Sequence, residues 1–278
     1  MLALLVACTA PAPDSGAADS AAHEITDYVV HRTTDPDPIE AGEEATFTLQ
    51  ITDQDGNPID DLQRTHERMV HTIFISRDLA DFQHVHHEDF ADITADDLQA
   101  ATFHFPVTFP TAGDELILYD FAHRDQWLYK NEIMVVDGAP MQATSPVVDL
   151  TESVDNADIH VDFSWTVAPV ANFEAVLSVH ITDTTGADVV DLVPWLGADG
   201  HAAVVCADLT LPGHTHAWFP DMEGVTPSHT MPHLYTGPDV PFHYTFAKAG
   251  VWKMWVQFAR AGAPDAPYAV PFMFEVAP

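Results

Sequence analysis

Residues 69–90 read MVHTIFISRDLADFQHVHHEDF, and this stretch decides the fold because its pattern occurs twice in the chain. It opens with His71 in front of an apolar run and closes with His84 and His86, which flank one valine. These histidines and two Asp-Leu pairs recur 130 positions later in one register, without a gap. The matched positions are Asp61, Leu62, His71, Asp78, Leu79, His84 and His86 with Asp191, Leu192, His201, Asp208, Leu209, His214 and His216. The chain is therefore two copies of one module, and each copy carries the same three histidines.

Around this stretch, short β-rich runs alternate with strong turn signals. The run Phe103–Phe109 alternates with a period of two, and Asp53–Pro58 and Asp183–Gly186 are turn sequences at matching places in the two copies. Only residues 89–100 suggest a short helical turn. Strands at this spacing, without helices between them, favour sandwiches over a parallel α/β sheet. We therefore predict an all-β fold of two tandem antiparallel β-sandwich domains.

Composition changes along the chain set the expected boundaries. Residues 1–8 form an apolar, signal-like segment, and residues 9–26 form a tether rich in Ala, Pro, Ser, Asp and Gly, which cannot build a core. We expect the first sandwich over residues 27–137, a linker over 138–146 and the second sandwich over 147–278.

The N-terminal segment MLALLVAC ends at Cys8 and resembles the lipobox of bacterial lipoproteins, whose cysteine becomes the lipidated N-terminus. It lacks the basic residues of a usual secretory signal. We expect export and a lipid anchor on Cys8, which would hold the protein in the cell envelope, in the periplasm or on the outer surface. No later stretch reaches the roughly 18 apolar residues of a membrane helix, so we expect membrane contact only through the lipid.

The chain is strongly acidic, because 9 Lys and Arg residues against 43 Asp and Glu residues give a net charge of −34. This charge argues against nucleic acid and anionic membrane surfaces as partners, since phosphate groups need clustered Lys and Arg. Such a field attracts divalent cations, although a solvated acidic surface explains the same composition. Two cysteines are too few for a disulfide framework, and Cys206, inside an apolar run, is expected to be a small buried side chain.

The spacing of the repeated histidines favours a metal site. Residues i and i+2 of an extended segment point to the same side, so His84 and His86 can converge on one cation with His71 as a third ligand. The same roles in the second copy fall to His201, His214 and His216. The alternative is that these histidines bond backbone groups at strand ends, but three of them recur in register while others among the 17 histidines do not. We expect one separate site in each domain, for copper, zinc or another divalent transition metal.

A second candidate site lies on a loop rich in proline and glycine. Residues 228–233 read SHTMPH and place His229, Met231 and His233 close together, a combination that suits copper in either oxidation state. A flexible polar loop is the alternative for this stretch. A blue-copper centre is disfavoured, because it needs a cysteine beside two histidines and the first copy has no cysteine.

The order of these motifs resembles the YtkA-like and related bacterial extracytoplasmic domains. The resemblance covers most of residues 28–278. Its motifs lie at Asp55–His86 in the first copy and at Asp191–His201 in the second, where DLVPWLGADGH is similar to the family's LxxYLGAxGH. It implies an Ig-like or cupredoxin-like sandwich in the cell envelope, often linked with copper or other heavy metals. The family's methionine two residues before the strand histidine is present as Met69, a further candidate ligand, but is replaced by Asp199 in the second copy.

Catalytic motifs of the common hydrolase, nucleotide-binding and zinc-protease kinds are absent from the sequence, so we do not expect an enzyme. The interpretation that we favour is an exported, membrane-tethered metal-binding protein, most simply a copper carrier, sensor or scavenger of the bacterial cell envelope. The alternative is a non-catalytic module that binds another envelope protein and has structural histidines. The metal content of the protein separates the two interpretations.

Overall fold

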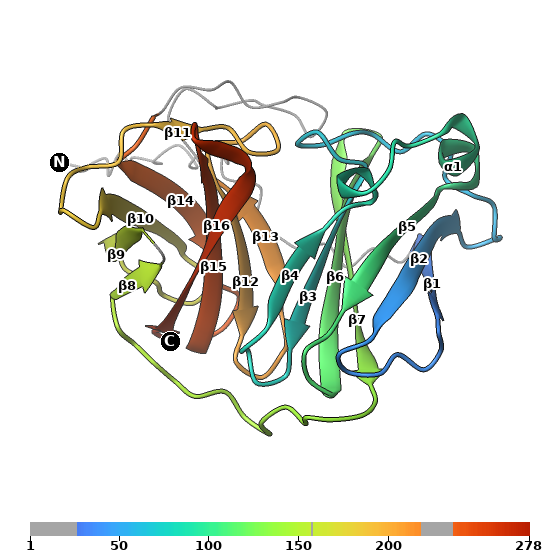
Figure 1. Ribbon diagram of the computed structural model, residues 1–278, viewed down its shortest axis with the longest axis horizontal. Coiled ribbons are helices and arrows are strands. Elements are labelled where there is room, and N and C mark those ends of the chain that lie inside the picture. Colours follow the sequence, from blue (N-terminus) through green and yellow to red (C-terminus); the bar gives the residue numbers. More distant parts are fainter. Residues whose placement is uncertain (1–26, 157, 218–235) are drawn as a thin grey trace, which may run out of the picture.

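The computed structural model describes residues 27–156, 158–217 and 236–278, and nearly all of its regular structure is β-strand (Figure 1). The first half contains β1 (Tyr28–Asp35), β2 (Glu44–Asp53), β3 (Val70–Ser76), β4 (Phe82–Val85), α1 (Ala95–Ala100), β5 (Thr102–Thr108), β6 (Gly113–His123) and β7 (Gln126–Val136). The second half contains β8 (Ser153–Asn156), β9 (Ile159–Val167), β10 (Glu174–Asp183), β11 (Leu192–Val193), β12 (His201–Cys206), β13 (Gly213–His216), β14 (Asp239–Thr245), β15 (Gly250–Arg260) and β16 (Ala263–Val276).

Each half is a sandwich of two sheets with its own core. In the first half, sheet β1-β2-β5 packs against sheet β4-β3-β6-β7 around Phe74 and Tyr119. In the second half, sheet β14-β10-β9-β8 packs against β11-β15-β12-β13, with β16 beside β15, around Phe242 and Trp252. All pairings between these strands are antiparallel. The predicted fold, an all-β tandem sandwich, is confirmed.

The strand β3 is buried on both faces, which a sheet with one solvated face does not require. Phe74 points into the core of the first sandwich, whereas Ile73 and Ile75 point the other way and meet Ala203 and Val205 of β12. Successive side chains of a strand point to opposite faces, so the alternation places His71 on the same face as Ile73. The unbroken apolar run of β3 is therefore explained by a second sheet that packs on its outer face.

The two sandwiches stack into four layers, with sheet β4-β3-β6-β7 against the sheet of β12, β13, β15 and β16 in the middle (Figure 1). One apolar cluster joins them, made of Ile73, Ile75, Leu79, Leu116, Leu118, Tyr129, Ala203, Val205, Leu209, Trp255 and Met273. Several of its members, such as Leu79 and Leu209, are equivalent positions of the repeat. Each copy therefore offers the same face to the other, as in an interface with two-fold symmetry.

The local expectations for the helical turn and for the repeated strand junction are confirmed. The helical turn expected in residues 89–100 is α1, where the hydroxyl of Thr94 accepts the backbone N–H of Asp97 as an N-cap. Val107–Gly113 (VTFPTAG) and Tyr244–Gly250 (YTFAKAG) are similar at an offset of 137. The structure repeats this junction, since β5 ends at Thr108 before Gly113 of β6, and β14 ends at Thr245 before Gly250 of β15. Across the described ranges, no helix has the length and apolar character needed to cross a membrane.

Candidate metal centre

Seven histidines gather at one end of the contact between the two central sheets. In the first domain, His66 lies in the turn before β3, His71 in β3, His84 in β4 and His86 directly after β4. In the second domain, His201 lies in β12, and His214 and His216 lie in β13. We call His71, His84 and His86 the first triad, and His201, His214 and His216 the second triad. Because β3 and β12 face each other, the two triads that the repeat encodes are brought to one place.

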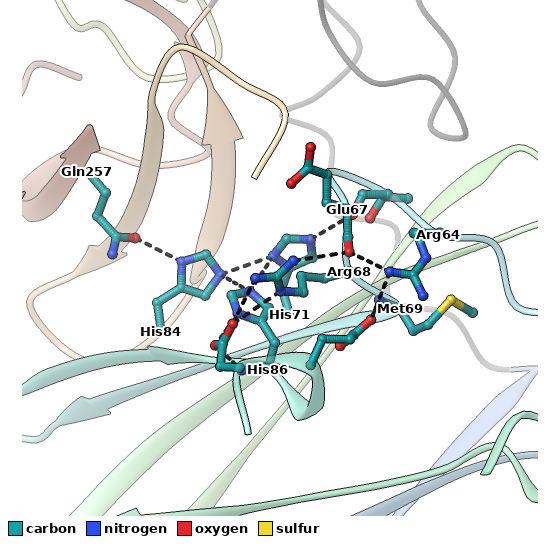
Figure 2. A network of polar contacts seen from close by, with 11 residues as sticks. Arg64, Glu67, Arg68, Met69, His71, His84, His86 and Gln257 are labelled. Carbon is teal, nitrogen blue, oxygen red and sulfur yellow. Dashed lines mark hydrogen bonds and ion pairs between the residues drawn. The ribbon is translucent and has the colours of Figure 1, made fainter. Parts of the chain in front are cut away.

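The ring nitrogens of the first triad converge on one point (Figure 2). Nδ1 of His71 lies 3.1 Å from Nε2 of His84 and 2.9 Å from Nε2 of His86, and the two Nε2 atoms are 3.1 Å apart. The same-side geometry of His84 and His86 on an extended segment, together with the pairing of β4 with β3, produces this triangle.

The outward nitrogen of each ring in the first triad has an oxygen partner. Nε2 of His71 donates to the carbonyl oxygen of Thr65 at 3.2 Å, and Nδ1 of His84 donates to Oε1 of Gln257 at 2.8 Å. Nδ1 of His86 donates to Oδ2 of Asp89 at 2.7 Å. A neutral imidazole has one N–H, so the three inward nitrogens carry lone pairs and no proton. Three lone pairs about 3 Å apart repel one another unless a cation lies between them.

A transition-metal ion fits this triangle. His71, His84 and His86 would hold the ion, because nitrogens 2.9–3.1 Å apart are compatible with metal–nitrogen bonds of about 2.0–2.1 Å. Three protein ligands would leave further positions on the ion for water or another ligand. Imidazole is a ligand for copper, zinc, nickel and iron, and a hydrogen bond from its other nitrogen to an oxygen fixes the tautomer.

The second triad repeats the arrangement of rings. The ring centroids of His201 and His214 are 4.7 and 4.6 Å from the ring centroid of His216. The equivalent distances from His71 and His84 to His86 are also 4.7 and 4.6 Å. Nδ1 of His201 is 3.4 Å from Nε2 of His214. The outward nitrogen of His201 donates to the carbonyl oxygen of Trp195 at 2.8 Å, which matches the bond from His71 to Thr65 one repeat earlier.

Each triad is also held by a residue from the other domain. Nδ1 of His84 bonds Gln257 of β15, and Nδ1 of His214 bonds Oδ2 of Asp120 of β6 at 2.7 Å. Asp120 and Gln257 are equivalent strand positions, because they are 137 residues apart, the same offset that aligns residues 107–113 (VTFPTAG) with residues 244–250 (YTFAKAG). The first triad thus receives a neutral amide from across the interface, whereas the second receives a buried carboxylate.

The two triads, expected as one separate site in each domain, lie side by side across the domain interface. Ring nitrogens of His71, His84 and His214 lie within 4.8 Å of one another, and the rings of His71 and His84 are 5.2 and 5.0 Å from that of His214. A sequence repeat shows which positions are equivalent, but it does not show that the two equivalent faces pack against each other. The six predicted histidines form one cluster between the domains, in which each triad is a candidate site of its own.

His66 is a member of the cluster that sequence reasoning missed, because Leu196 stands at the equivalent position of the second copy. It is 2 % exposed, and neither ring nitrogen makes a hydrogen bond of ordinary geometry. Its ring stacks on that of His216 with 3.6 Å between centroids and 19° between planes. One ring nitrogen each of His66, His201 and His216 lie within 4.8 Å of one another, so His66 is a further candidate ligand beside the second triad.

The protonation behaviour of the cluster follows from its burial. Burial lowers the pKa of His66 to about 3. Burial, and then the neighbouring imidazoles, lower the pKa of His71, His201 and His214 well below the ordinary value. Although burial alone would raise it, hydrogen bonds from His86 and Arg68 lower the pKa of Asp89 to about 2. His66, His71, His201 and His214 are therefore neutral at pH 7, with their acceptor nitrogens available to a metal ion.

The other sequence candidates are not brought to this centre. Met69 packs in the core of the first sandwich, and its sulfur points away from the histidines (Figure 2). Cys206 is buried in the core of the second sandwich, as expected, and burial raises the pKa of its thiol. The loop candidates and the proposed lipid attachment lie outside the described residues: His229, Met231, His233 and Cys8.

One family model matches both halves of the chain. The model described as Domain of unknown function (DUF8832) covers residues 23–138 and, a second time, residues 152–277. No curated protein matches the chain. The match reproduces the two copies inferred from the repeat, and membership of the YtkA-like group stays a proposal.

Solved structures similar to this chain include two single domains and an adhesin. A DUF4426 family protein from Pseudomonas aeruginosa PAO1 is 10% identical, with 46% of this chain and 98% of that chain covered and a TM-score of 0.29. FetP of uropathogenic Escherichia coli strain F11 is 11% identical, with 45% and 93% covered and a TM-score of 0.30. The Escherichia coli adhesin FdeC is 15% identical, with 90% and 64% covered and a TM-score of 0.27.

Proposed function

The chain belongs, over both of its halves, to the family described as Domain of unknown function (DUF8832), and we propose that it binds divalent transition-metal ions, copper first among them, between its two domains. The observation that carries the proposal is the first triad, in which three unprotonated imidazole nitrogens lie 2.9–3.1 Å apart. Each ring is held by a bond from its other nitrogen to an oxygen, which is the usual support of a metal-ligating histidine.

The donor set favours copper in its divalent state, or zinc. Among divalent ions of the first transition row, nitrogen sites bind copper most tightly. Met69 and Cys206 point into the two cores, so neither offers a soft ligand for cuprous ion at the triads. A site of this kind suits storage or transfer, because three protein ligands leave positions that another ligand can take.

The biological role that we propose is that of a carrier, sensor or scavenger of the bacterial cell envelope. The support is the lipobox-like segment before Cys8, the tether that follows it and the resemblance to YtkA-like domains. A net charge of −34 raises the local concentration of cations around such a protein.

The metal content of the protein tests the proposal. The chain, prepared without a histidine tag, is loaded with cupric ion, freed of weakly bound metal by gel filtration and measured by mass spectrometry of the elements. We expect two ions per chain, one for each triad, and a parallel preparation with zinc compares the two metals. A chain that retains neither metal would overturn the proposal and favour the interaction module with structural histidines.

A further inference from the structure

A cavity of about 560 Å³ lies between the two domains and reaches the first triad. Its wall includes His84 and both groups that hold the triad from outside, Gln257 and Asp89. Figure 2 shows His84 between Gln257 and the turn that carries Glu67 and Arg68. His84 is partly exposed here, whereas His201, His214 and His216 are at most 3 % exposed.

The charge of the cavity wall is negative. Four carboxylates line it, from Glu67, Glu88, Asp89 and Asp265, against one guanidinium, that of Arg68. Arg68 donates to Oδ1 of Asp89 at 3.0 and 3.2 Å, so its charge is paired within the wall. A concave surface of one sign focuses its field and concentrates ions of the opposite sign.

Glu88 supplies a second observation that points to a cation. Its side chain is 10 % exposed, and its Oε1 accepts the backbone N–H of Met69 at 2.9 Å and lies 3.7 Å from the guanidinium of Arg64. Oε2 is buried and has no hydrogen-bond partner. A buried carboxylate oxygen without a partner is costly unless a cation or a donor approaches it.

We propose that this cavity is the access route of the metal centre, in which Glu88 and the neighbouring carboxylates hold a hydrated divalent transition-metal cation before it passes to His84. This inference rests on the proposed function. The cation exchanges a carboxylate and water for the inward nitrogen of His84, and then for those of His71 and His86, without a change of oxidation state. The first triad fills before the second, because the described cavity opens on the first triad.

Stopped-flow kinetics of cupric ion binding tests the route. Trp195 reports binding by its fluorescence, since its ring lies 5.6 Å from that of His84 and 5.1 Å from that of His201. The variant Glu67→Gln/Asp265→Asn removes two exposed charges of the wall, neither of which touches a triad histidine. The matched control, Glu43→Gln/Asp96→Asn, removes two exposed charges that do not line the cavity.

We expect the wall variant to bind cupric ion at least about threefold more slowly than the control at about 10 mM salt, with the difference lost at about 0.5 M salt. Dissociation should be the same in both, because the ligands of the bound ion are unchanged. Glu88→Gln keeps an oxygen for the N–H of Met69 and should slow association in the same way. Equal rates in the wall variant and the control would overturn the route while leaving the metal centre intact. A wild-type chain that binds no cupric ion would overturn the centre itself.

Discussion

The two triads have the same ligands in the same arrangement, yet their surroundings differ. The first triad borders a cavity and receives the neutral amide of Gln257 from the other domain. The second triad is buried and receives the carboxylate of Asp120 at the equivalent position. A carboxylate partner makes an imidazole a stronger ligand and offsets part of the charge of a bound cation. The comparison teaches that both copies keep the same three histidines while their outer partners differ. Under the proposed function, the first triad would exchange its ion and the second would retain it.

Replacing two histidines of one triad at a time should have the largest effect, because it should change the number of ions that the chain binds. His84→Ala/His86→Ala should lose the readily exchanged ion and keep the slowly exchanged one, because each triad supplies three ligands of its own. His214→Ala/His216→Ala should do the reverse. Equilibrium dialysis with cupric ion measures the stoichiometry, which should fall from two ions to one in each variant.

The control for both variants is a melting curve without metal, which reports whether the domain interface survives. Unchanged stoichiometry in both variants would show that the repeated histidines are structural. It would move the site to His229, Met231 and His233, outside the described residues.

Substitution of the residues that bond each triad from the other domain, Asp120 and Gln257, should have the next largest effect, which is on the affinity for each ion. Asp120→Asn should weaken the tighter ion by about 10–100-fold, the usual consequence of losing an outer partner of a ligating histidine. Gln257→Glu should strengthen the weaker ion, since it gives the first triad the carboxylate that the second already has. Competition with a chelator of known affinity measures both. If Asp120→Asn left both affinities unchanged while Gln257→Glu weakened one, the assignment of the two triads would be wrong.

Substitution of His66 should have the smallest effect, which is on the stability of the metal-free protein. It tests the difference between the two copies at this position, where the first has His66 and the second has Leu196. The pKa of His66 is about 3 when folded and about 6.5 when unfolded, so the unfolded chain binds more protons between these values. Stability of the metal-free protein is therefore lost as pH falls below about 6.5. His66→Leu, which copies Leu196, should recover about 2 kcal/mol of unfolding free energy at about pH 5 and much less at about pH 8.

Urea unfolding at the two pH values measures this change. His31→Leu is a control on the surface, because its side chain is exposed and contacts Thr52 on a neighbouring strand. Equal effects of His66→Leu at the two pH values would contradict a buried neutral imidazole at this position.

Much of the fold follows from the sequence, because its signals are local. The period of two, the turn sequences and the 130-residue register predict strands, sandwiches and two equivalent sets of histidines. The approach of His84 to His86 also follows from local geometry, since residues i and i+2 of an extended chain share a side.

The domain interface could not be read from these signals. The run Thr72–Ile75 of β3 has apolar side chains on both faces, which indicates a second packing surface. The sequence does not show that this surface belongs to the other copy. Asp120 and Gln257 had a signal in the 137-residue register, but their role exists only once the two copies face each other. His66 had no signal from the repeat, because one copy alone carries it.

The most direct test of the central claim is an anomalous difference map from a crystal of the chain loaded with copper, recorded at the copper absorption edge. The account expects two peaks between β3 and β12, one about 2.0–2.1 Å from Nδ1 of His71 and Nε2 of His84 and His86, and one beside His201, His214 and His216. Peaks confined to surface carboxylates or to residues 228–233, with the six histidines bare, would contradict it.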